Sequence, residues 1–177
     1  MKKRLIFLIF LLSISVQVQA QTEWIVVPHT DTDTGLQTRI ATMRNEAGYK
    51  IEIYIDSNDA VRKRFSIRDG HDLLATKQCP TFQVDKNKST NRSTNNATCI
   101  SQPRWAEYIL GYISHRSLYK RLSPLYSIIH GDVIYFRFLL KDGGYAQTLF
   151  SLHGSNKAVH SALGKNLFVV NKMDNGF

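Results

Sequence analysis

Cysteine is scarce in this chain, with only Cys79 and Cys99 among 177 residues. Two thiolates are too few for a structural zinc site unless histidines join them, and no histidine stands at ligand spacing from either cysteine. A C-x-x-C redox pair is absent as well. We therefore predict one disulfide, Cys79–Cys99, which favours an oxidising compartment.

Motifs that carry catalysis or bind phosphate are also lacking. The chain has no G-x-S-x-G, no P-loop, no G-x-G-x-x-G and no H-E-x-x-H. Asp33-Thr34-Gly35 matches the tripeptide of aspartic proteases, but no second copy supplies the other carboxylate of the dyad. The same stretch, from Asp31, resembles the start of a calcium loop, yet Thr42 stands where the loop needs glutamate. We predict no catalytic residue, no metal site and no cofactor.

Long hydrophobic runs are confined to the first twenty residues. The basic residues Lys2–Arg4 precede an apolar run at 5–16 that is too short to span a bilayer comfortably. Val18-Gln19-Ala20 then supplies a small-residue cleavage site. We predict that residues 1–20 are a cleaved signal peptide and that the rest of the chain is periplasmic or extracellular. No later run is apolar enough to predict a transmembrane span.

Negative charge is in the minority, with 14 acidic against 23 basic residues and a net charge of +9. The predicted signal peptide holds three of the basic and none of the acidic residues, which leaves 20 against 14, or +6. Such a surplus favours weak contact with polyanions, including lipid headgroups and polysaccharides. We expect no specific nucleic-acid target, and the alternative is a soluble exported protein whose charge has no target at all.

Short alternating segments fill most of the remaining chain, with turn residues every eight to twelve positions. This pattern predicts a mainly β fold, an antiparallel β-sandwich or barrel with one or two short helices in the C-terminal half. The expected strands cover residues 24–27, 36–43, 49–56, 61–68, 79–85, 108–114, 133–140, 145–152 and 167–170. The first of them is expected to end at Pro28.

The strongest pattern lies between residues 131 and 163. Asp142-Gly143-Gly144 separates two alternating segments and predicts a tight hairpin turn, since glycine tolerates positive φ. Gly154-Ser155 begins a predicted helix that ends at Gly164. A second short helix is expected to begin at Ser123-Pro124, with proline at its first position.

The chain is predicted to form a single domain at residues 21–170, followed by a polar tail at 171–177. Residues 86–98 are almost wholly Asn, Ser, Thr, Lys and Arg, so they bury too little apolar surface to order themselves. We predict a flexible polar loop there, closed at its base by Cys79–Cys99. Closing a loop of about twenty residues stabilises the fold by roughly 3 kcal/mol.

Basic and aromatic residues gather near the segment at 61–68. Alternation places Arg62, Arg64 and Arg68 on one face, and Arg104-Trp105 adds a further basic and aromatic pair. Such side chains stack on and neutralise a polyanion or a sugar; the alternative is a solvated sheet face. We predict a non-catalytic exported binding domain that uses this face against an envelope or host protein. The alternative function is a small exported hydrolase, or an inhibitor of an exported enzyme.

Two short elements near the C-terminus carry a family resemblance. Gly131-Asp132-Val133 opens a strand, and Ser151-Leu152-His153-Gly154 precedes a helix containing Ala158. Together with Trp24 soon after the predicted signal peptide, they resemble the invasion-associated locus B family of exported bacterial proteins. The resemblance implies a periplasmic or secreted β-sandwich linked to host colonisation and virulence, and it supplies no catalytic residues.

Overall fold

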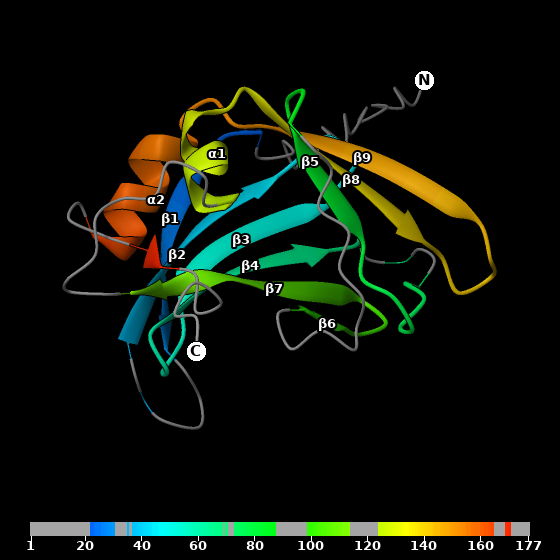
Figure 1. Ribbon diagram of the computed structural model, residues 1–177, viewed down its shortest axis with the longest axis horizontal. Coiled ribbons are helices and arrows are strands. Elements are labelled where there is room, and N and C mark those ends of the chain that lie inside the picture. The colour runs from blue at the N-terminus through cyan, green and yellow to red at the C-terminus, as the bar shows by residue number, and fades with distance from the viewer. Residues whose placement is uncertain are drawn as a thin grey trace, which may run out of the picture.

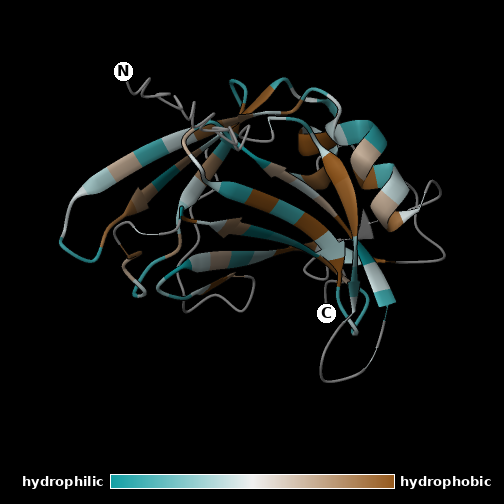
Figure 2. Cartoon of the chain, turned by 180° about the vertical axis from the view of Figure 1, so that it is seen from behind, coloured by the Kyte–Doolittle hydropathy of each residue, from teal (hydrophilic) through white to brown (hydrophobic). Residues whose placement is uncertain are grey.

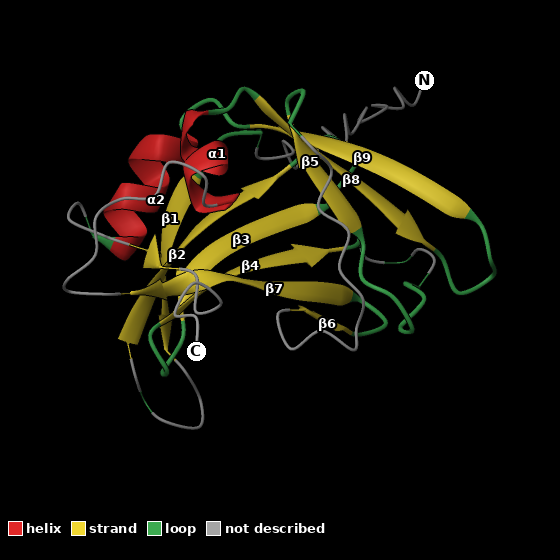
Figure 3. Ribbon diagram, in the orientation of Figure 1, coloured by secondary structure: helices red, strands yellow, loops and turns green. Residues whose placement is uncertain are grey.

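The computed structural model of the chain describes residues 22–30, 35, 37–68, 70, 73–87, 99–113 and 124–164, and the backbone of 169–170. The predicted signal peptide, the tail at 171–177, the Asp31 and Asp33 stretch and most of the polar loop (88–98) lie outside the described residues. The described residues form a mainly β fold of two antiparallel sheets and two short helices, as predicted (Figure 3).

The larger sheet has seven strands (Figure 1). Its spatial order is β1 (Ile25–Thr30), β2 (Gln37–Arg44), β3 (Lys50–Ile55), β4 (Ala60–Ser66), β7 (Trp105–Ile113) and β10 (Val169–Val170), and β6 (Cys99–Ser101) also pairs with β7. Every pairing is antiparallel. The predicted hairpins of the N-terminal half are thus neighbours in one sheet.

The smaller sheet has the order β5 (Thr81–Val84), β8 (Val133–Leu139), β9 (Tyr145–Ser151). The hairpin between β8 and β9 turns at Asp142-Gly143-Gly144, where Gly143 has φ 92°. This positive φ is the conformation for which the sequence selects glycine. The β8–β9 register runs without interruption over seven residue pairs, so the hairpin prediction is confirmed.

The core lies between the two sheets. Inward side chains of β3 and β4 meet inward side chains of β5, β8 and β9, and the rings of Phe65 and Phe136 stack with centroids 4.5 Å apart. Phe150 meets both rings edge to face, a favourable arrangement for aromatic pairs. Figure 2 shows hydrophobic and hydrophilic residues alternating along the strands, and the hydrophobic ones form the core.

Two helices, α1 (Pro124–His130) and α2 (Ser155–Leu163), lie beside the smaller sheet (Figure 1). The helix α2 buries Ala158, Val159 and Leu163 at the predicted helical spacing and packs on β1, β2 and β3. The two helices are joined where the Ser155 hydroxyl donates to the Ile128 carbonyl at 2.9 Å. They close the end of the core that the smaller sheet leaves open.

Two strand boundaries differ from the predictions by three residues, and one strand was not predicted. The first strand continues through Pro28 to Thr30, because β1 is an edge strand and proline is tolerated there. The strand expected at 108–114 begins earlier, at Trp105. The three-residue strand β6 was not predicted, since Cys99–Ser101 follows a polar stretch and is too short to show a period.

The disulfide joins Cys79, just before β5, to Cys99 in β6, with the two Cα atoms 6.6 Å apart. It therefore links the smaller sheet to the larger one. Both cysteines are buried, and a disulfide of this kind indicates an oxidising compartment. The pairing predicted from the cysteine count is present.

Candidate binding surface

The candidate surface is the outer face of the larger sheet, across β3, β4 and β7. Along each strand, every second residue points away from the core. Tyr54 on β3, Arg62 and Arg64 on β4, and Trp105 and Glu107 on β7 alternate with buried neighbours in this way. Strand pairing brings them together, since Tyr54 is opposite Arg62, and Arg64 lies between Glu52 and Glu107.

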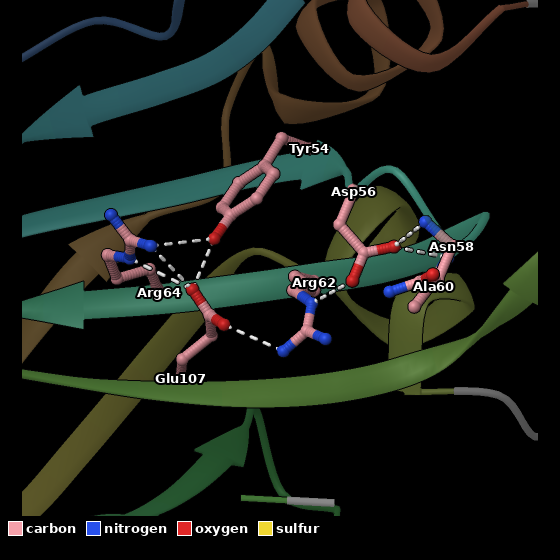
Figure 4. A network of polar contacts seen from close by, with 7 residues as sticks. All are labelled: Tyr54, Asp56, Asn58, Ala60, Arg62, Arg64 and Glu107. Atoms are coloured by element: carbon pink, nitrogen blue, oxygen red, sulfur yellow. Dashed lines mark hydrogen bonds and ion pairs between the residues drawn. The ribbon is translucent and has the colours of Figure 1, made fainter. Parts of the chain in front are cut away.

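Glu107 is the centre of the polar network on this face (Figure 4). Its side chain is 7% exposed, and its Oε1 atom accepts from Nη1 of Arg62 at 2.8 Å. Its Oε2 atom accepts from Nε of Arg64 at 2.9 Å and from the Tyr54 hydroxyl. Two guanidinium groups and one phenol therefore surround one carboxylate, which holds all four side chains in fixed positions.

Asp56 extends the network to the turn between β3 and β4. One of its oxygens accepts from the backbone N–H groups of Asn58 and Ala60, both at 2.9 Å, and the other pairs with Nε of Arg62. Burial alone would raise the pKa of Asp56, but the Ala60 amide, the Arg62 guanidinium and the Asn58 amide together lower it below its ordinary value. Asp56 therefore fixes both the turn and the orientation of Arg62.

Tyr54 stays protonated in this setting. Burial is the largest cause that raises its pKa, and the hydrogen bond to Glu107 raises it further. Its hydroxyl donates to Glu107 and accepts from Nη2 of Arg64 at 2.9 Å. The phenol thus connects the carboxylate to the guanidinium and orients both.

Arg64 contacts two aromatic rings. Its guanidinium carbon is 4.8 Å from the Trp105 ring centroid and 5.5 Å from the Tyr54 ring centroid, within the range of cation–π contacts. Ile100 on the neighbouring β6 is opposite Glu107 in the register, and its side chain is 46% exposed. An exposed apolar side chain therefore lies on the other side of Glu107 from Arg64.

The predicted surface residues do not all meet. Arg62, Arg64 and Trp105 lie together, whereas Arg68 lies beyond the end of β4 with its guanidinium carbon 6.0 Å from the Tyr49 ring centroid. Arg104 is exposed just before β7, and its carbonyl accepts from the N–H of Ile67. The cluster that the strands assemble is smaller than the predicted one.

The outer face is balanced in charge rather than strongly basic. Three cations, Lys50, Arg62 and Arg64, are paired with three carboxylates, since Lys50 also bonds Glu52 at 2.8 Å. The residues that sequence reasoning missed are the acceptors, Asp56 and Glu107, and the phenol of Tyr54. Aligning the hairpin at Ser57–Ala60 would have placed Glu52 and Tyr54 opposite the arginines, so a signal for part of the network was present.

Lys63 points the other way, into the core. It alternates with Arg62 and Arg64 on β4, and its side chain is fully buried. Its ammonium nitrogen lies over the rings of Phe82, Tyr108 and Phe136. This lysine therefore belongs to the interior and contributes nothing to the outer face.

Within the described part of the chain, no group of three or more His, Cys, Asp and Glu side chains is arranged to hold a metal ion. His153 is exposed before α2, and His160 is half-buried within that helix. His130 packs its ring against Tyr126, with centroids 4.2 Å apart. The arrangement that the described residues do build is a rigid polar and aromatic surface.

Comparisons with protein-family models, with curated proteins and with solved structures return no match for this chain. The resemblance to the invasion-associated locus B family therefore stays a prediction. Among the described residues, no helix has both the length and the apolar character needed to cross a membrane.

Proposed function

We propose that this protein is a non-catalytic exported binding domain whose partner is another protein, and that the outer face of the larger sheet is its contact surface. The observation that carries the proposal is the contact of the Arg64 guanidinium with the rings of Trp105 and Tyr54, with Glu107 holding the guanidinium in place. Trp, Tyr and Arg are the residue types that dominate the energetic centres of protein interfaces.

Rigidity of the cluster favours binding. Holding a long side chain in one rotamer costs free energy on association, and a cluster ordered beforehand avoids that cost. The Glu107 and Tyr54 hydrogen bonds order Arg64 before any partner arrives. Exposed Ile100, opposite Glu107 on β6, adds an apolar side chain to the same face.

The balance of charge on this face favours a protein partner over a polyanion. Arg62 and Arg64 already have carboxylate partners, so a phosphate or sulfate would have to compete with Asp56 and Glu107. Weak polyanion contact would then involve basic residues elsewhere in the domain, consistent with the net charge of +6 left after the predicted signal peptide is removed.

Export is supported by two independent features. The disulfide Cys79–Cys99 fits an oxidising compartment, and residues 1–20 have the pattern of a cleaved signal peptide. We therefore place the domain in the periplasm or outside the cell, with an envelope or host protein as its partner. Roles in the envelope, in a secretion apparatus or in host interaction all fit this location.

The test is an affinity capture with variants matched for surface character. The protein is expressed with its own leader, recovered from the exported fraction, immobilised and exposed to envelope extract at low and high salt. We expect a discrete partner that is retained at high salt, that is lost with Trp105→Ala and Arg64→Ala, and that is kept with Lys157→Ala on the exposed side of α2. Circular dichroism checks that each variant is folded.

Two results would contradict the proposal. Many partners that all dissociate at high salt would mean that net charge is the attraction. A salt-resistant partner that binds Trp105→Ala as well as the unaltered protein would place the contact elsewhere. Arg68→Ala and Arg104→Ala then show whether the outlying members of the predicted surface take part.

A further inference from the structure

The sheet edges of this protein are protected unequally. Natural edge strands are kept short, or carry charge, proline or a bulge, because an open edge pairs readily with another chain. The edge strand β1 contains Pro28, and β5, β6 and β10 have four, three and two residues. The remaining edge strand, β9, has seven residues, no charge, no proline and no bulge.

Among the described residues, no strand pairs with the outer side of β9. The N–H of Leu152 donates to the Asp132 carbonyl, and the N–H of Leu140 donates to the Gly144 carbonyl. Backbone groups therefore point toward β8 at the even-numbered residues of β9 and away from it at the odd-numbered ones. Two outward carbonyls are capped by side chains: Leu149 accepts from Asn45 Nδ2 at 2.7 Å, and Ser151 accepts from Trp24 Nε1 at 2.9 Å.

Apolar side chains accompany these backbone groups. Tyr145 is 74% exposed and Leu149 is 51% exposed, which makes β9 the site of two of the three large exposed hydrophobic residues among those described. Figure 1 shows β9 at the outer margin of the smaller sheet. An unprotected edge with exposed apolar side chains is a feature that a soluble protein retains for contact with another chain.

A cavity of about 560 Å³ runs along the same edge, between β9 and the turn that joins β2 to β3. Met43, Ala47 and Leu149 supply apolar lining, and Glu46 is the charged residue of the lining. Glu46 is exposed and has no ion pair within the described ranges. The volume falls in the range of about 300–1,000 Å³ typical of binding pockets.

We propose that β9 and this cavity bind a short extended segment of a partner protein by strand addition. The backbone of the segment pairs with the open side of β9 between Tyr145 and Leu149. One apolar side chain of the segment enters the cavity, and a Lys or Arg two residues away, on the same face of the segment, pairs with Glu46. In strand addition, main-chain hydrogen bonds supply affinity and a side-chain pocket supplies specificity.

Charge and space favour such a segment over a second copy of this chain. Pairing two β9 strands would bring no basic residue of β9 to Glu46, because Tyr145–Ser151 is uncharged. The Asn45 and Trp24 side chains already cap the carbonyls at the Leu149–Ser151 end, which leaves a shorter stretch free. A short segment with one basic residue fits the uncapped part of β9 and supplies the cation that pairs with Glu46.

This site is separate from the outer face of the larger sheet. It uses β9 and the β2–β3 turn, whereas Trp105 and Arg64 lie on β7 and β4. Failure of one proposal is therefore distinguishable from failure of the other, because Trp105→Ala leaves the β9 site unaltered.

The test uses a display library of random peptides of about eight residues, selected against the exported protein. We expect the enriched peptides to have an apolar residue and a basic residue two positions apart, so that both side chains lie on one face of the added strand. Glu46→Lys should weaken their binding by about fivefold or more, since an attraction becomes a repulsion at an exposed site. Changing the basic residue of the peptide to Glu should restore binding to Glu46→Lys, and Trp105→Ala should bind as the unaltered protein does.

Backbone pairing has its own readout. In an added strand, only every second amide of the peptide faces β9. N-methylation of that set of amides should abolish binding, and N-methylation of the other set should leave binding unchanged. Leu149→Asp, at a position that is 51% exposed and is therefore expected to tolerate substitution, should also reduce binding. Selection without enrichment, or binding that neither Glu46→Lys nor Leu149→Asp weakens, would overturn the proposal. A dimer seen by sedimentation, and lost with Leu149→Asp, would make the occupant a second copy and overturn it as well.

Discussion

The ammonium nitrogen of Lys63 lies 2.6 Å from the centroid of the Phe82 ring, in the interior between the two sheets. The ring centroids of Tyr108 and Phe136 are 4.4 and 4.8 Å from the same atom. A cation over an aromatic face gains about 2 kcal/mol when water is excluded, which offsets part of the cost of burying it. Aromatic residues of β5, β7 and β8 thus accommodate a charge contributed by β4.

Replacing Lys63 separates the contribution of its stem from that of its charge. Lys63→Ala removes a long side chain from a fully buried position and should lower the free energy of unfolding by about 2–5 kcal/mol through the cavity it leaves. Lys63→Met keeps most of the volume and should stay within about 1.5 kcal/mol of the unaltered protein. Urea denaturation of both variants measures the difference, and equal losses would show that the ammonium itself is the stabilising group.

Reduction of Cys79–Cys99 should weaken the fold without abolishing it. The bond closes a loop between residues 20 apart in sequence, which corresponds to roughly 3 kcal/mol in the chain-entropy model. The double variant Cys79→Ala/Cys99→Ala should therefore unfold at lower urea, and a thiol reductant should shift the unaltered protein but not the double variant. If the reductant shifts the urea midpoint of both proteins equally, loss of the disulfide is not the cause of the shift.

The fold was predictable because its sequence signals are local. Alternation identified the β8–β9 hairpin and most other strands, and Gly143 supplied the positive φ of the turn. The errors occurred where tertiary context decides. Proline is excluded from inner strands, but β1 is an edge strand, so Pro28 lies within it. The strand β6 exists because β7 offers it a partner, which its three residues do not reveal.

The candidate surface was predictable only in part, for a different reason. Periodicity shows that Arg62 and Arg64 share a face with each other, but it does not show what the neighbouring strand places against them. Glu107 follows Arg64 by 43 residues, and only the pairing of β4 with β7 brings the two together. The face looks basic along β4 alone, but it is balanced in charge when β3, β4 and β7 are taken together.

Glu107→Gln tests the centre of the network. The amide keeps the shape but loses the charge that two arginines share. Because the side chain of Arg64 is 36% exposed and Arg62 keeps Asp56, water and the remaining carboxylate compensate in part. We expect Glu107→Gln to lower the free energy of unfolding by about 1.5–3 kcal/mol, measured by urea denaturation. Breaking a fully buried ion pair would cost more, about 3–5 kcal/mol.

The matched control for this substitution is Glu52→Gln, which breaks a single ion pair with the half-buried Lys50 on the same face. It should cost less than about 1 kcal/mol. Similar losses in the two variants would mean that Glu107 does not organise the surface.

Asp56 makes the free energy of unfolding depend on pH in the acidic range. Burial tends to raise its pKa, but the amides of Ala60 and Asn58 and the Arg62 guanidinium outweigh it and hold the pKa below its ordinary value of 3.8. The folded state therefore binds this proton less readily than the unfolded state does. The stabilisation is present above about pH 3.8 and is lost as pH falls through the lower pKa of the folded state.

Asp56→Asn removes that dependence. The variant should be less stable than the unaltered protein at neutral pH, because the ion pair with Arg62 is gone while the amide oxygen still accepts from the turn. The two stability curves, measured by urea denaturation across the acidic range, should then converge as pH falls below about 3.8. Glu46→Gln, an exposed carboxylate outside the network, controls for the loss of one negative charge. A gap between Asp56→Asn and the unaltered protein that stays constant with pH would show that Asp56 acts through the geometry of its turn alone.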